Sequence, residues 1–240
     1  MADAIFELPR LAAIYDVHDA PRDDLEPYLD LAVELGARRV ADVGCGTGNL
    51  ALALAAHGFA VTGVDPAAAS LQVAASKPGA ERVRWVHGYA RDLKASAYDL
   101  ALMTGNVAQA IADPGAWAAT LDGTHRALRP GGRLVFETRD PLARGWEAWT
   151  RDTSHRVVDV PGVGPVESWV ELTVVELPLV SLRWTFVFDD GDVLTSDSTL
   201  RFRGHGEVES DLTDHGFDVV EVRGAPDRPG LELVFIARST

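Results

Sequence analysis

The most constraining feature of the sequence is an apolar run that ends in three alternating glycines and is followed by a second apolar run ending in an acid. The first run is 39–43, the glycines are Gly44, Gly46 and Gly48, and the second run, 61–64, ends at Asp65. A strand, a glycine turn, a helix and a second strand in this order place the acid beside the turn. Glycine lets a ligand approach without a Cβ in the way, and a helix N-terminus offers free N–H groups to an anion. The pattern therefore predicts a site for an adenosine-containing cofactor, with Asp65 accepting hydrogen bonds from a ribose diol.

Two cofactor classes use such a site, and the glycine spacing distinguishes them. The dinucleotide fingerprint is G-x-G-x-x-G with an acid about 20 residues further on. Here the glycines follow G-x-G-x-G, and Asn49 occupies the position of the third dinucleotide glycine. The position of Asp65 suits either class. An NAD(P)-dependent oxidoreductase therefore stays open as an alternative, and so does a tight turn that binds no ligand.

Further segments give the chain a resemblance to one family. The stretch 42–48 resembles motif I of class I S-adenosylmethionine-dependent methyltransferases, and Asp65 lies where that family has its ribose-binding acid. Residues 87–93 fall where the family contacts adenine, and 128–136 resemble its turn into the fifth strand. The resemblance covers about residues 15–140 and returns near the C-terminus. It implies a methyltransferase that uses S-adenosyl-L-methionine as cofactor and a small molecule as methyl acceptor.

The resemblance, together with the position of residues 104–106 directly after the fourth strand, indicates which residues bind the cofactor. These are Tyr15, Gly44, Cys45, Gly46, Asn49, Asp65, Pro66, Tyr89, Ala90, Arg91, Thr104, Gly105 and Asn106. The family usually has an acid after the glycine of its third segment, where the adenine amino group binds, and this chain has Tyr89 there. The backbone N–H of Ala90 can still meet an adenine ring nitrogen, and Asp92 is a candidate for the replaced acid. Cys45 is the only cysteine, so no intrachain disulfide forms, and we interpret it as a small buried residue of the glycine loop rather than a nucleophile.

Methyl transfer from a sulfonium is an in-line displacement, so the main task of the protein is to align nucleophile, methyl carbon and sulfur. A general base is needed only when the acceptor arrives protonated. No catalytic residue is obvious from the sequence, and the candidates are Tyr15, His18 and Asn106. The pair Tyr15-Asp16 resembles an N-terminal pair that many small-molecule methyltransferases fold over the cofactor. A non-catalytic S-adenosylmethionine-binding protein is the alternative from another functional class, because fold alone does not fix function.

Alternating apolar and helical segments predict an α/β fold. Strands are expected at about 39–43, 60–64, 83–87, 98–103 and 133–138, with helices at about 48–57, 66–76 and 114–128 between them. The segments 217–223 and 231–238 are joined by a short loop and predict an antiparallel hairpin at the sheet edge. The expected fold is a doubly wound, mostly parallel, seven-stranded Rossmann-like sheet with this C-terminal hairpin.

An inserted antiparallel sheet is expected after the fifth strand. From about 155 to 203 the chain is rich in Val, Thr, Trp and Phe, and turn sequences at 161–165 and 189–192 interrupt it. Trp146, Trp149, Trp169 and Trp184 flank this region or lie in it, as walls of a substrate pocket or dimer contact or as packing residues. The predicted division is an N-terminal helical cap at 1–36, a cofactor-binding α/β domain at 37–145 and 204–240, and an insert at 146–203 that forms a substrate lid or dimer region.

Composition excludes several partners. The net charge is -14, with 36 acidic against 22 basic side chains, which disfavours nucleic acid and anionic membrane surfaces. There is no HExxH or CxxC motif, so no metal is expected.

The first ten residues lack the apolar stretch of a signal peptide, and no long apolar run follows, so we expect a cytoplasmic protein, monomeric or homodimeric. The acceptor, and whether N, O, C or S is methylated, is left open by the sequence.

Overall fold

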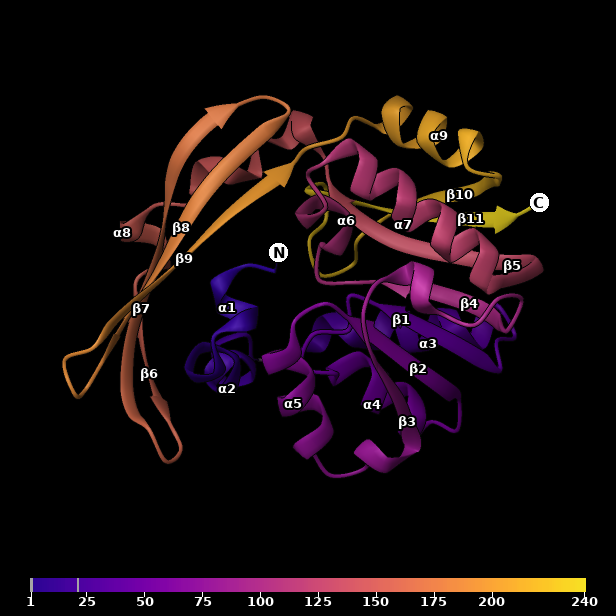
Figure 1. Cartoon of the computed structure of the whole chain (residues 1–240). Helices are drawn as coiled ribbons and strands as arrows, with labels where there is room; N and C mark the ends of the chain where they lie inside the picture. Colours follow the sequence, from indigo (N-terminus) through magenta and orange to yellow (C-terminus); the bar gives the residue numbers. More distant parts are fainter. Residues whose placement is uncertain (1, 21) are drawn as a thin grey trace.

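The computed structural model describes residues 2–20 and 22–240, and these residues form two separate sheets (Figure 1). The larger sheet has seven strands in the order β10-β11-β5-β4-β1-β2-β3. Its strands are β1 Arg39–Val43, β2 Ala60–Asp65, β3 Val83–His87, β4 Tyr98–Met103, β5 Leu128–Arg139, β10 Phe217–Gly224 and β11 Glu232–Ser239. Strands β1 to β5 are parallel, whereas β11 is antiparallel to both β5 and β10. The predicted seven-stranded sheet with a C-terminal antiparallel hairpin is confirmed.

Helices cover both faces of the larger sheet, as expected for a doubly wound fold. On one face α3 (Glu26–Glu34) and α4 (Asn49–Ala56) pack Leu31 and Leu54 against strand residues such as Leu100. On the other face α7 (Pro114–Ala127) and α9 (His205–Asp214) pack Trp117 and Leu212 against the sheet. The parallel strands are therefore buried on both faces, which explains their continuous apolar runs.

Two element boundaries differ from the sequence-based expectation. Strand β5 begins at Leu128 rather than near residue 133, because Leu128 already pairs with Tyr98 of β4. The Pro-Gly-Gly segment bulges between this pair and the next one, Leu100 with Arg133, and Gly131 has a φ of +76°. Helix α5 spans Ala68–Ser76, with Ala67 as its N-cap, so Pro66 precedes the helix instead of opening it. The backbone N–H of Ala67 donates to the Asp65 side chain, which fixes the turn before the helix.

The smaller sheet is the predicted insert, with the strand order β6-β7-β8-β9 and antiparallel pairing throughout. Its strands are β6 Arg156–Val160, β7 Gly164–Glu176, β8 Leu179–Phe188 and β9 Val193–Arg201. The turns at 161–163 and 189–192 lie where the sequence places them, whereas the turn at Leu177-Pro178 was missed because a single Leu-Pro step is a weak turn signal. Before β6, residues 141–154 form the short helices η4 (Pro141–Ala143), η5 (Gly145–Ala148) and α8 (Arg151–Ser154).

The N-terminal helices α1 (Ala4–Glu7) and α2 (Pro9–His18) lie between the inserted sheet and the α/β part (Figure 1). Their apolar side chains, including Leu11 and Ile14, pack on Phe186 and Phe188 of the insert. After α2 come the short helix η1 (Asp23–Leu25) and then α3, which packs on the larger sheet. Residues 1 and 21 of the predicted 1–36 segment lie outside the described residues.

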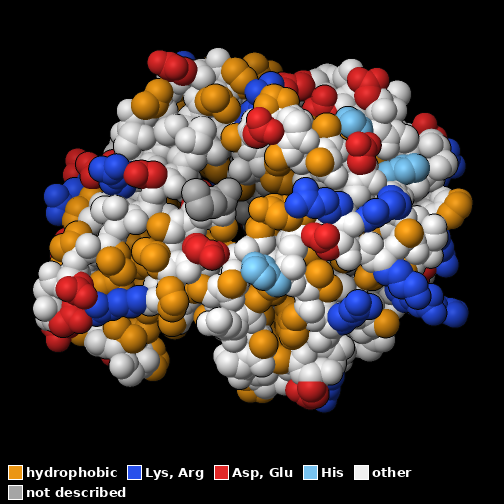
Figure 2. Space-filling view, in the orientation of Figure 1, with side chains coloured by type: hydrophobic (Ala, Val, Ile, Leu, Met, Phe, Trp, Pro, Cys, Tyr) orange, Lys and Arg blue, Asp and Glu red, His pale blue; other side chains and the backbone are white. Residues whose placement is uncertain are grey.

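Three short helices complete the chain: η2 (Ala80–Arg82) and η3 (Ala90–Asp92) flank β3, and α6 (Val107–Ala110) follows β4. In the view of Figure 2 the surface is notched between the inserted sheet and the α/β part. Within the described residues, no helix is both long and apolar enough to span a membrane.

Candidate cofactor and acceptor site

The glycine turn after β1 has the backbone shape that its sequence requires. Gly44, Gly46 and Gly48 have φ values of +76°, +51° and +81°, a region that side chains with a Cβ rarely adopt. A Cβ at Gly44 would lie 2.5 Å from Cγ2 of Val107, so the turn and α6 pack in direct contact. A Cβ at Gly46 would meet nothing within 4 Å, which means that the turn presents open space at its tip.

Asp65 lies beside this turn, as predicted. Its Oδ2 accepts a hydrogen bond from the Gly46 N–H at 2.8 Å, and its Oδ1 accepts one from the Ala67 N–H at 2.7 Å. The side chain belongs to a residue that is only 7% exposed, and this burial raises its pKa although both backbone hydrogen bonds oppose the shift. Each carboxylate oxygen keeps acceptor capacity beyond these two bonds, which a ribose diol can use.

A cavity of about 640 Å³ opens at the carboxyl ends of β1, β2 and β4. Ligands in open α/β sheets bind at this end of the strands. Twelve of the thirteen predicted cofactor residues line the cavity: Tyr15, Gly44, Cys45, Gly46, Asn49, Asp65, Pro66, Tyr89, Ala90, Arg91, Thr104 and Gly105. The thirteenth, Asn106, lines a neighbouring cavity instead. The structure therefore brings twelve of the thirteen predicted residues together around one space, and each residue's role there stays a prediction.

Asp42 also lines this cavity, and the sequence-based set omits it. It is 2% exposed, and its Oδ2 has no hydrogen-bond partner among the described residues. Burial, with a smaller effect from the charge of Asp65, raises the Asp42 pKa to about 7. A buried, unsatisfied carboxylate oxygen is suited to a cationic ligand group. An acid within the otherwise apolar run 40–43 is the sequence signal that identifies it.

The segment predicted to contact adenine is held by local contacts. Tyr89 is 47% exposed, and the Arg91 guanidinium lies 4.8 Å from the centre of its ring. Asp92 accepts the Tyr89 N–H at 2.9 Å and closes the turn, and it is not among the residues around the cavity in the described part of the chain. A Cβ at Gly123 of α7 would lie 2.6 Å from the Arg91 backbone nitrogen. This segment is therefore positioned by its own turn and by a close approach of α7.

Helix α2 is tied to the glycine turn through Asp16. Its Oδ1 accepts hydrogen bonds from Thr47 Oγ1 at 2.5 Å and Asn49 Nδ2 at 3.0 Å. Its Oδ2 forms an ion pair with Lys77 Nζ at 2.5 Å. The preceding residue, Tyr15, lines the cofactor cavity. Tyr15 thus borders the cavity from the N-terminal side, and Asp16 anchors its helix to the glycine turn. The role of the pair over a bound cofactor stays a prediction.

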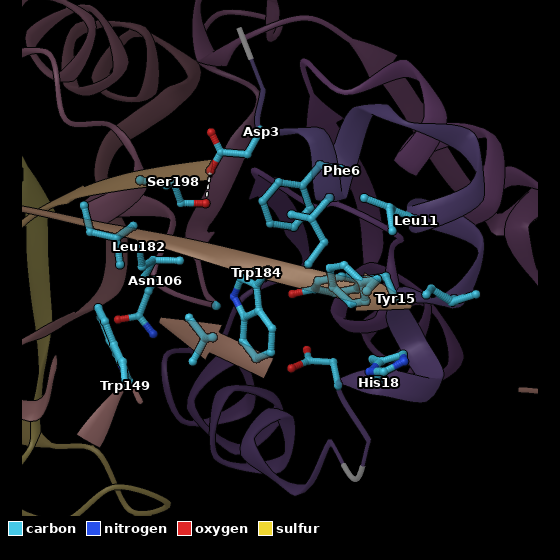
Figure 3. Close-up of a pocket in the computed structure, with 18 of the residues that line it drawn as sticks. Asp3, Phe6, Leu11, Tyr15, His18, Asn106, Trp149, Leu182, Trp184 and Ser198 are labelled. Carbon is cyan, nitrogen blue, oxygen red and sulfur yellow. Dashed lines mark hydrogen bonds between the residues drawn. The ribbon is translucent and has the colours of Figure 1, made fainter. Parts of the chain in front are cut away.

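A second cavity of about 230 Å³ adjoins the first, between α1 and α2, the turn after β4 and the inner face of the inserted sheet (Figure 3). Its walls include the aromatic side chains of Phe6, Tyr15, Trp149, Trp184 and Phe186. Five residues border both cavities: Asp3, Phe6, Tyr15, Gly105 and Ala110. The two spaces therefore meet beneath the N-terminal helices.

The four tryptophans near the insert occupy different environments. Trp149 and Trp184 line the second cavity. Trp146 is buried and packs against Phe202 with ring centres 4.6 Å apart. Trp169 stacks with His155 and lies under the Arg151 guanidinium. Two of the four tryptophans are therefore pocket walls. Trp169 is not one of them, because β7 and β8 present Trp169 and Trp184 at adjacent registers on opposite faces of the sheet.

His18, a candidate catalytic residue, lines the second cavity. It is 5% exposed, its Nδ1 lies 3.4 Å from Ser168 Oγ, and its Nε2 has no partner among the described residues. Burial, and secondarily the charge of Arg156, lowers the His18 pKa to about 4. The imidazole is therefore neutral at physiological pH, and it can exchange a hydrogen bond with a bound molecule.

Asn106 adopts a left-handed backbone conformation, with φ of +62°. Its N–H donates to Glu137 Oε1 at 2.8 Å. With its amide oxygen toward Arg139, the side chain accepts from that guanidinium at 3.2 Å and donates to Gln109 at 3.1 Å. Burial raises the Glu137 pKa to about 7. The Asn106 side chain is thus part of a buried polar cluster that holds the turn after β4.

The acidic turn 189–192 is engaged by a cation from α2. Arg10 forms ion pairs with Asp190 at 2.6 Å and Asp192 at 2.5 Å. These ion pairs join the N-terminal cap to the insert.

Among residues 2–20 and 22–240, no group of three or more His, Cys, Asp or Glu side chains is arranged to hold a metal ion.

Comparison with known proteins agrees with this architecture. Residues 40–132 match the methyltransferase domain family. The chain is 35% identical over 126 residues to a ubiquinone biosynthesis O-methyltransferase from Paracidovorax citrulli, covering 50% of this chain and 51% of the relative. The solved structure of the CcbJ methyltransferase from Streptomyces caelestis gives a TM-score of 0.75 at 21% identity, covering 95% of this chain and 97% of that one. The solved structure of S-adenosylmethionine-bound CalS10, an amino pentose methyltransferase from Micromonospora echinaspora, gives a TM-score of 0.69 at 22% identity. That match covers 95% of this chain and 95% of the CalS10 chain.

At these identities the solved structures show a common fold, insert included. The chain spans about half the length, or less, of the first curated relatives that it matches. The matched segment contains the glycine turn, Asp65 and the segment around Tyr89. Residues 40–132 therefore match the methyltransferase domain family, and the chain shares its fold with solved methyltransferase structures.

Proposed function

We propose that this protein transfers a methyl group from S-adenosylmethionine to a small-molecule acceptor. The observation that carries the proposal is the meeting of two cavities at Tyr15 and Gly105, one built around the glycine turn and one enclosed by the inserted sheet. A donor in the first and an acceptor in the second can approach each other there. Such alignment of two reactants is the main catalytic requirement of an in-line displacement.

Residues of the first cavity offer partners for two groups of S-adenosylmethionine, the ribose and the α-ammonium. The Asp65 carboxylate provides acceptors for a ribose diol, and the open tip at Gly46 admits the ligand. The unsatisfied Oδ2 of Asp42 provides an acceptor for the α-ammonium of the methionine part. Cys45 lines the cavity without acting as a nucleophile, because burial raises its thiol pKa well above the usual value and disfavours a thiolate.

The bound donor supplies a methyl group on positively charged sulfur, which is already activated toward attack. The protein then has to orient the acceptor and exclude water. Tyr15 lies at the junction of the cavities, and burial raises the pKa of its phenol, so it stays protonated and acts through hydrogen bonding and packing. His18 is neutral and lies further inside the acceptor cavity. The cap helices enclose the junction, and the Asp16 contacts hold them closed.

The insert, residues 146–203, is proposed to select the acceptor and to leave cofactor binding to the α/β domain. Its inner face contributes Trp184 and Leu182 to the second cavity but contributes nothing to the first within the described residues. Relatives named for ubiquinone biosynthesis and for an amino pentose act on small molecules, which supports an acceptor of that size here. No macromolecular partner is required by this arrangement.

The two alternatives from the sequence are separated from the proposal by one experiment. Calorimetry of the purified protein should give binding of S-adenosylmethionine and S-adenosylhomocysteine and no binding of NAD or NADP. Turnover of the donor in the presence of small-molecule acceptors, followed as S-adenosylhomocysteine release, distinguishes an enzyme from a binding protein. Tight nicotinamide cofactor binding without a response to either sulfur compound would overturn the proposal.

A further inference from the structure

The junction of the two cavities is where a methyl group would change hands, so the side chains at the junction face the reacting atoms. Five residues border both spaces, and three of them, Phe6, Gly105 and Ala110, carry no acid-base group. Tyr15 stays a neutral phenol. Asp3 is thus the one carboxylate among the five. This inference rests on the proposed function, since the junction has this meaning only for group transfer between the cavities.

The Asp3 side chain departs from its ordinary local role. Asp3 is the N-cap residue of α1, and an aspartate there usually accepts hydrogen bonds from the first backbone N–H groups of the helix. Its side chain makes no such bond; Oδ2 instead accepts a hydrogen bond from Ser198 Oγ of β9 at 2.6 Å (Figure 3). In the described part of the chain, the hydrogen bonds of this carboxylate use Oδ2 alone. A residue that breaks a local rule in a cavity is a candidate for function.

The N-terminus of α1 is anchored so that this geometry is reproducible. The Ile5 N–H donates to Ser196 Oγ at 2.9 Å, two residues from Ser198 on the same strand. Phe6 packs against Tyr15 with ring centres 5.4 Å apart. The carboxylate is therefore held at the junction by the inserted sheet on one side and by the aromatic pair on the other.

The other charged side chains of the acceptor cavity are already paired or stacked. Arg139 forms an ion pair with the buried Glu232 at 3.3 Å, and Asp19 forms one with Arg22 at 3.0 Å. Arg156 lies 5.9 Å from the ring centre of Trp184. Asp3 has a hydroxyl as its neighbour and no ion pair among the described residues. Burial raises the Asp3 pKa, so a cationic ligand group would stabilise its charged form.

We propose that the methyl acceptor is an amine and that the Asp3 carboxylate binds its N–H group at the junction of the two cavities. The aromatic walls formed by Trp149, Trp184 and Phe6 would pack against the apolar body of the acceptor, with the amine directed at Asp3. A protonated amine on an apolar ring suits this combination, because a cation near aromatic faces and one carboxylate is stabilised by both.

The reaction then balances without a further reactant. The ammonium form of the acceptor gives one proton to the Asp3 carboxylate, which passes it to solvent, and the freed nitrogen lone pair attacks the methyl carbon. An N–CH3 bond forms while the S–CH3 bond breaks, and the electron pair of that bond stays on sulfur. The products are the N-methylated amine and S-adenosylhomocysteine. An alcohol acceptor would leave the Asp3 charge uncompensated and would be a much weaker nucleophile.

The test measures binding of matched acceptor pairs to protein saturated with S-adenosylhomocysteine. The pairs are benzylamine with benzyl alcohol, cyclohexylamine with cyclohexanol, and glucosamine with glucose, followed by calorimetry or tryptophan fluorescence. At least one amine should bind tenfold or more tightly than its alcohol, and Asp3→Asn should remove that preference. The control variant Glu7→Gln removes one charge from the same helix at an exposed position and should keep it. Binding of amine and alcohol with equal affinity, absence of binding by any pair, or a preference that survives in Asp3→Asn would overturn the proposal.

Turnover and cofactor binding complete the test. With an amine that binds, mass spectrometry should detect the N-methyl product, and Asp3→Asn should lower kcat/KM by about 10²–10⁴-fold, the usual effect of losing a positioned proton acceptor. The affinities for S-adenosylmethionine and S-adenosylhomocysteine should change equally and by less than threefold. A selective loss of S-adenosylmethionine affinity would assign Asp3 to the sulfonium and overturn the amine role. Failure of both sulfur compounds to bind wild type would instead reject the proposed function itself.

Discussion

The Asp16 carboxylate of α2 lies 2.5 Å from Nζ of Lys77, the residue that follows α5, and the same ammonium group donates to Asn49 Oδ1 and to the Thr47 carbonyl, each at 2.7 Å. One cation thus joins the N-terminal cap to the glycine turn. The cap supplies Tyr15 to the cofactor cavity, so the contact links cofactor access to the position of α2. Both side chains are partly shielded from solvent, which limits screening of the pair.

Replacing this lysine should loosen the cap. Lys77→Met removes the ion pair and two hydrogen bonds, and a loss of about 1 kcal/mol corresponds to roughly fivefold weaker cofactor binding. The change should appear mainly as faster cofactor dissociation in stopped-flow measurements, with faster amide exchange in α1 and α2. Lys94→Met is a matched control, since Lys94 is exposed and is the only other lysine of the chain. Equal dissociation rates in the two variants would mean that the contact does not hold the cap.

Asp65 should be required for cofactor affinity and for the shape of the turn. Both of its oxygens accept backbone N–H groups, so Asp65→Asn places an amide NH2 against either Gly46 or Ala67. Loss of charged hydrogen bonds, worth roughly 1.5–3 kcal/mol, should weaken binding by about one to two orders of magnitude in calorimetry. The matched control is Asp92→Asn, which changes a carboxylate that accepts one backbone N–H outside the cavity lining. If Asp65→Asn folds and binds normally, the ribose assignment is wrong.

Asp42 offers a prediction in which binding and stability move in opposite directions. Its folded pKa of about 7 lies above the ordinary value of 3.8. The stabilisation from keeping it protonated is fully present below about pH 4 and is lost as pH rises through about 7. Asp42→Asn should therefore be more stable than wild type at about pH 8, by about 1–3 kcal/mol, and similar to it at about pH 4. The variant should also bind S-adenosylmethionine more weakly. Thermal melts and calorimetry at the two pH values give both quantities, and a variant less stable at pH 8 would contradict the assignment of Asp42 as an unpaired buried acid.

Much of the α/β part could be predicted from local sequence because its elements are short and strongly patterned. The bounds of β3 and β4 agree with the expected 83–87 and 98–103, since apolar parallel strands are bounded there by turn residues. The glycine turn and Asp65 are adjacent in the structure because the strand-helix-strand connection places the carboxyl ends of β1 and β2 side by side.

The acceptor side could not be predicted in the same way, because long-range packing creates it. Asp3 and Ser198 are 195 residues apart, and no local pattern relates an N-cap aspartate to a distant strand. Trp169 and Trp184 look equivalent in sequence, yet the strand register turns one outward and the other into the cavity. The acid within the run 40–43 stands out in the sequence, but the lack of a partner for its Oδ2 among the described residues is a property of the folded chain.

His18 should make the protein sensitive to acid. Its folded pKa of about 4 lies below the ordinary 6.5, so the neutral ring contributes stability that is fully present above pH 6.5 and is lost as pH falls toward 4. In His18→Leu this acid-dependent loss should shrink by about 1–3 kcal/mol, measured by urea unfolding between about pH 7 and pH 4. His57→Leu, at an exposed position, is the control and should keep the wild-type acid dependence. If His18→Leu loses as much unfolding free energy between about pH 7 and pH 4 as wild type does, the ring is not buried as a neutral group.

The tryptophan pair on β7 and β8 tests whether the insert selects the acceptor. Trp184 lines the acceptor cavity and stacks on Phe186, whereas Trp169 lies at the neighbouring register on the outer face. Both are partly exposed, so either alanine change should cost about 1–3 kcal/mol, and folding is checked first by melting temperature. In folded protein, Trp184→Ala should lower kcat/KM for the acceptor by about tenfold or more through lost aromatic packing, with cofactor affinity near wild type. Trp169→Ala should keep both. Equal acceptor kinetics in the two variants would remove the inner face from acceptor recognition, and a loss confined to Trp169→Ala would move the acceptor contact to the outer face of the sheet.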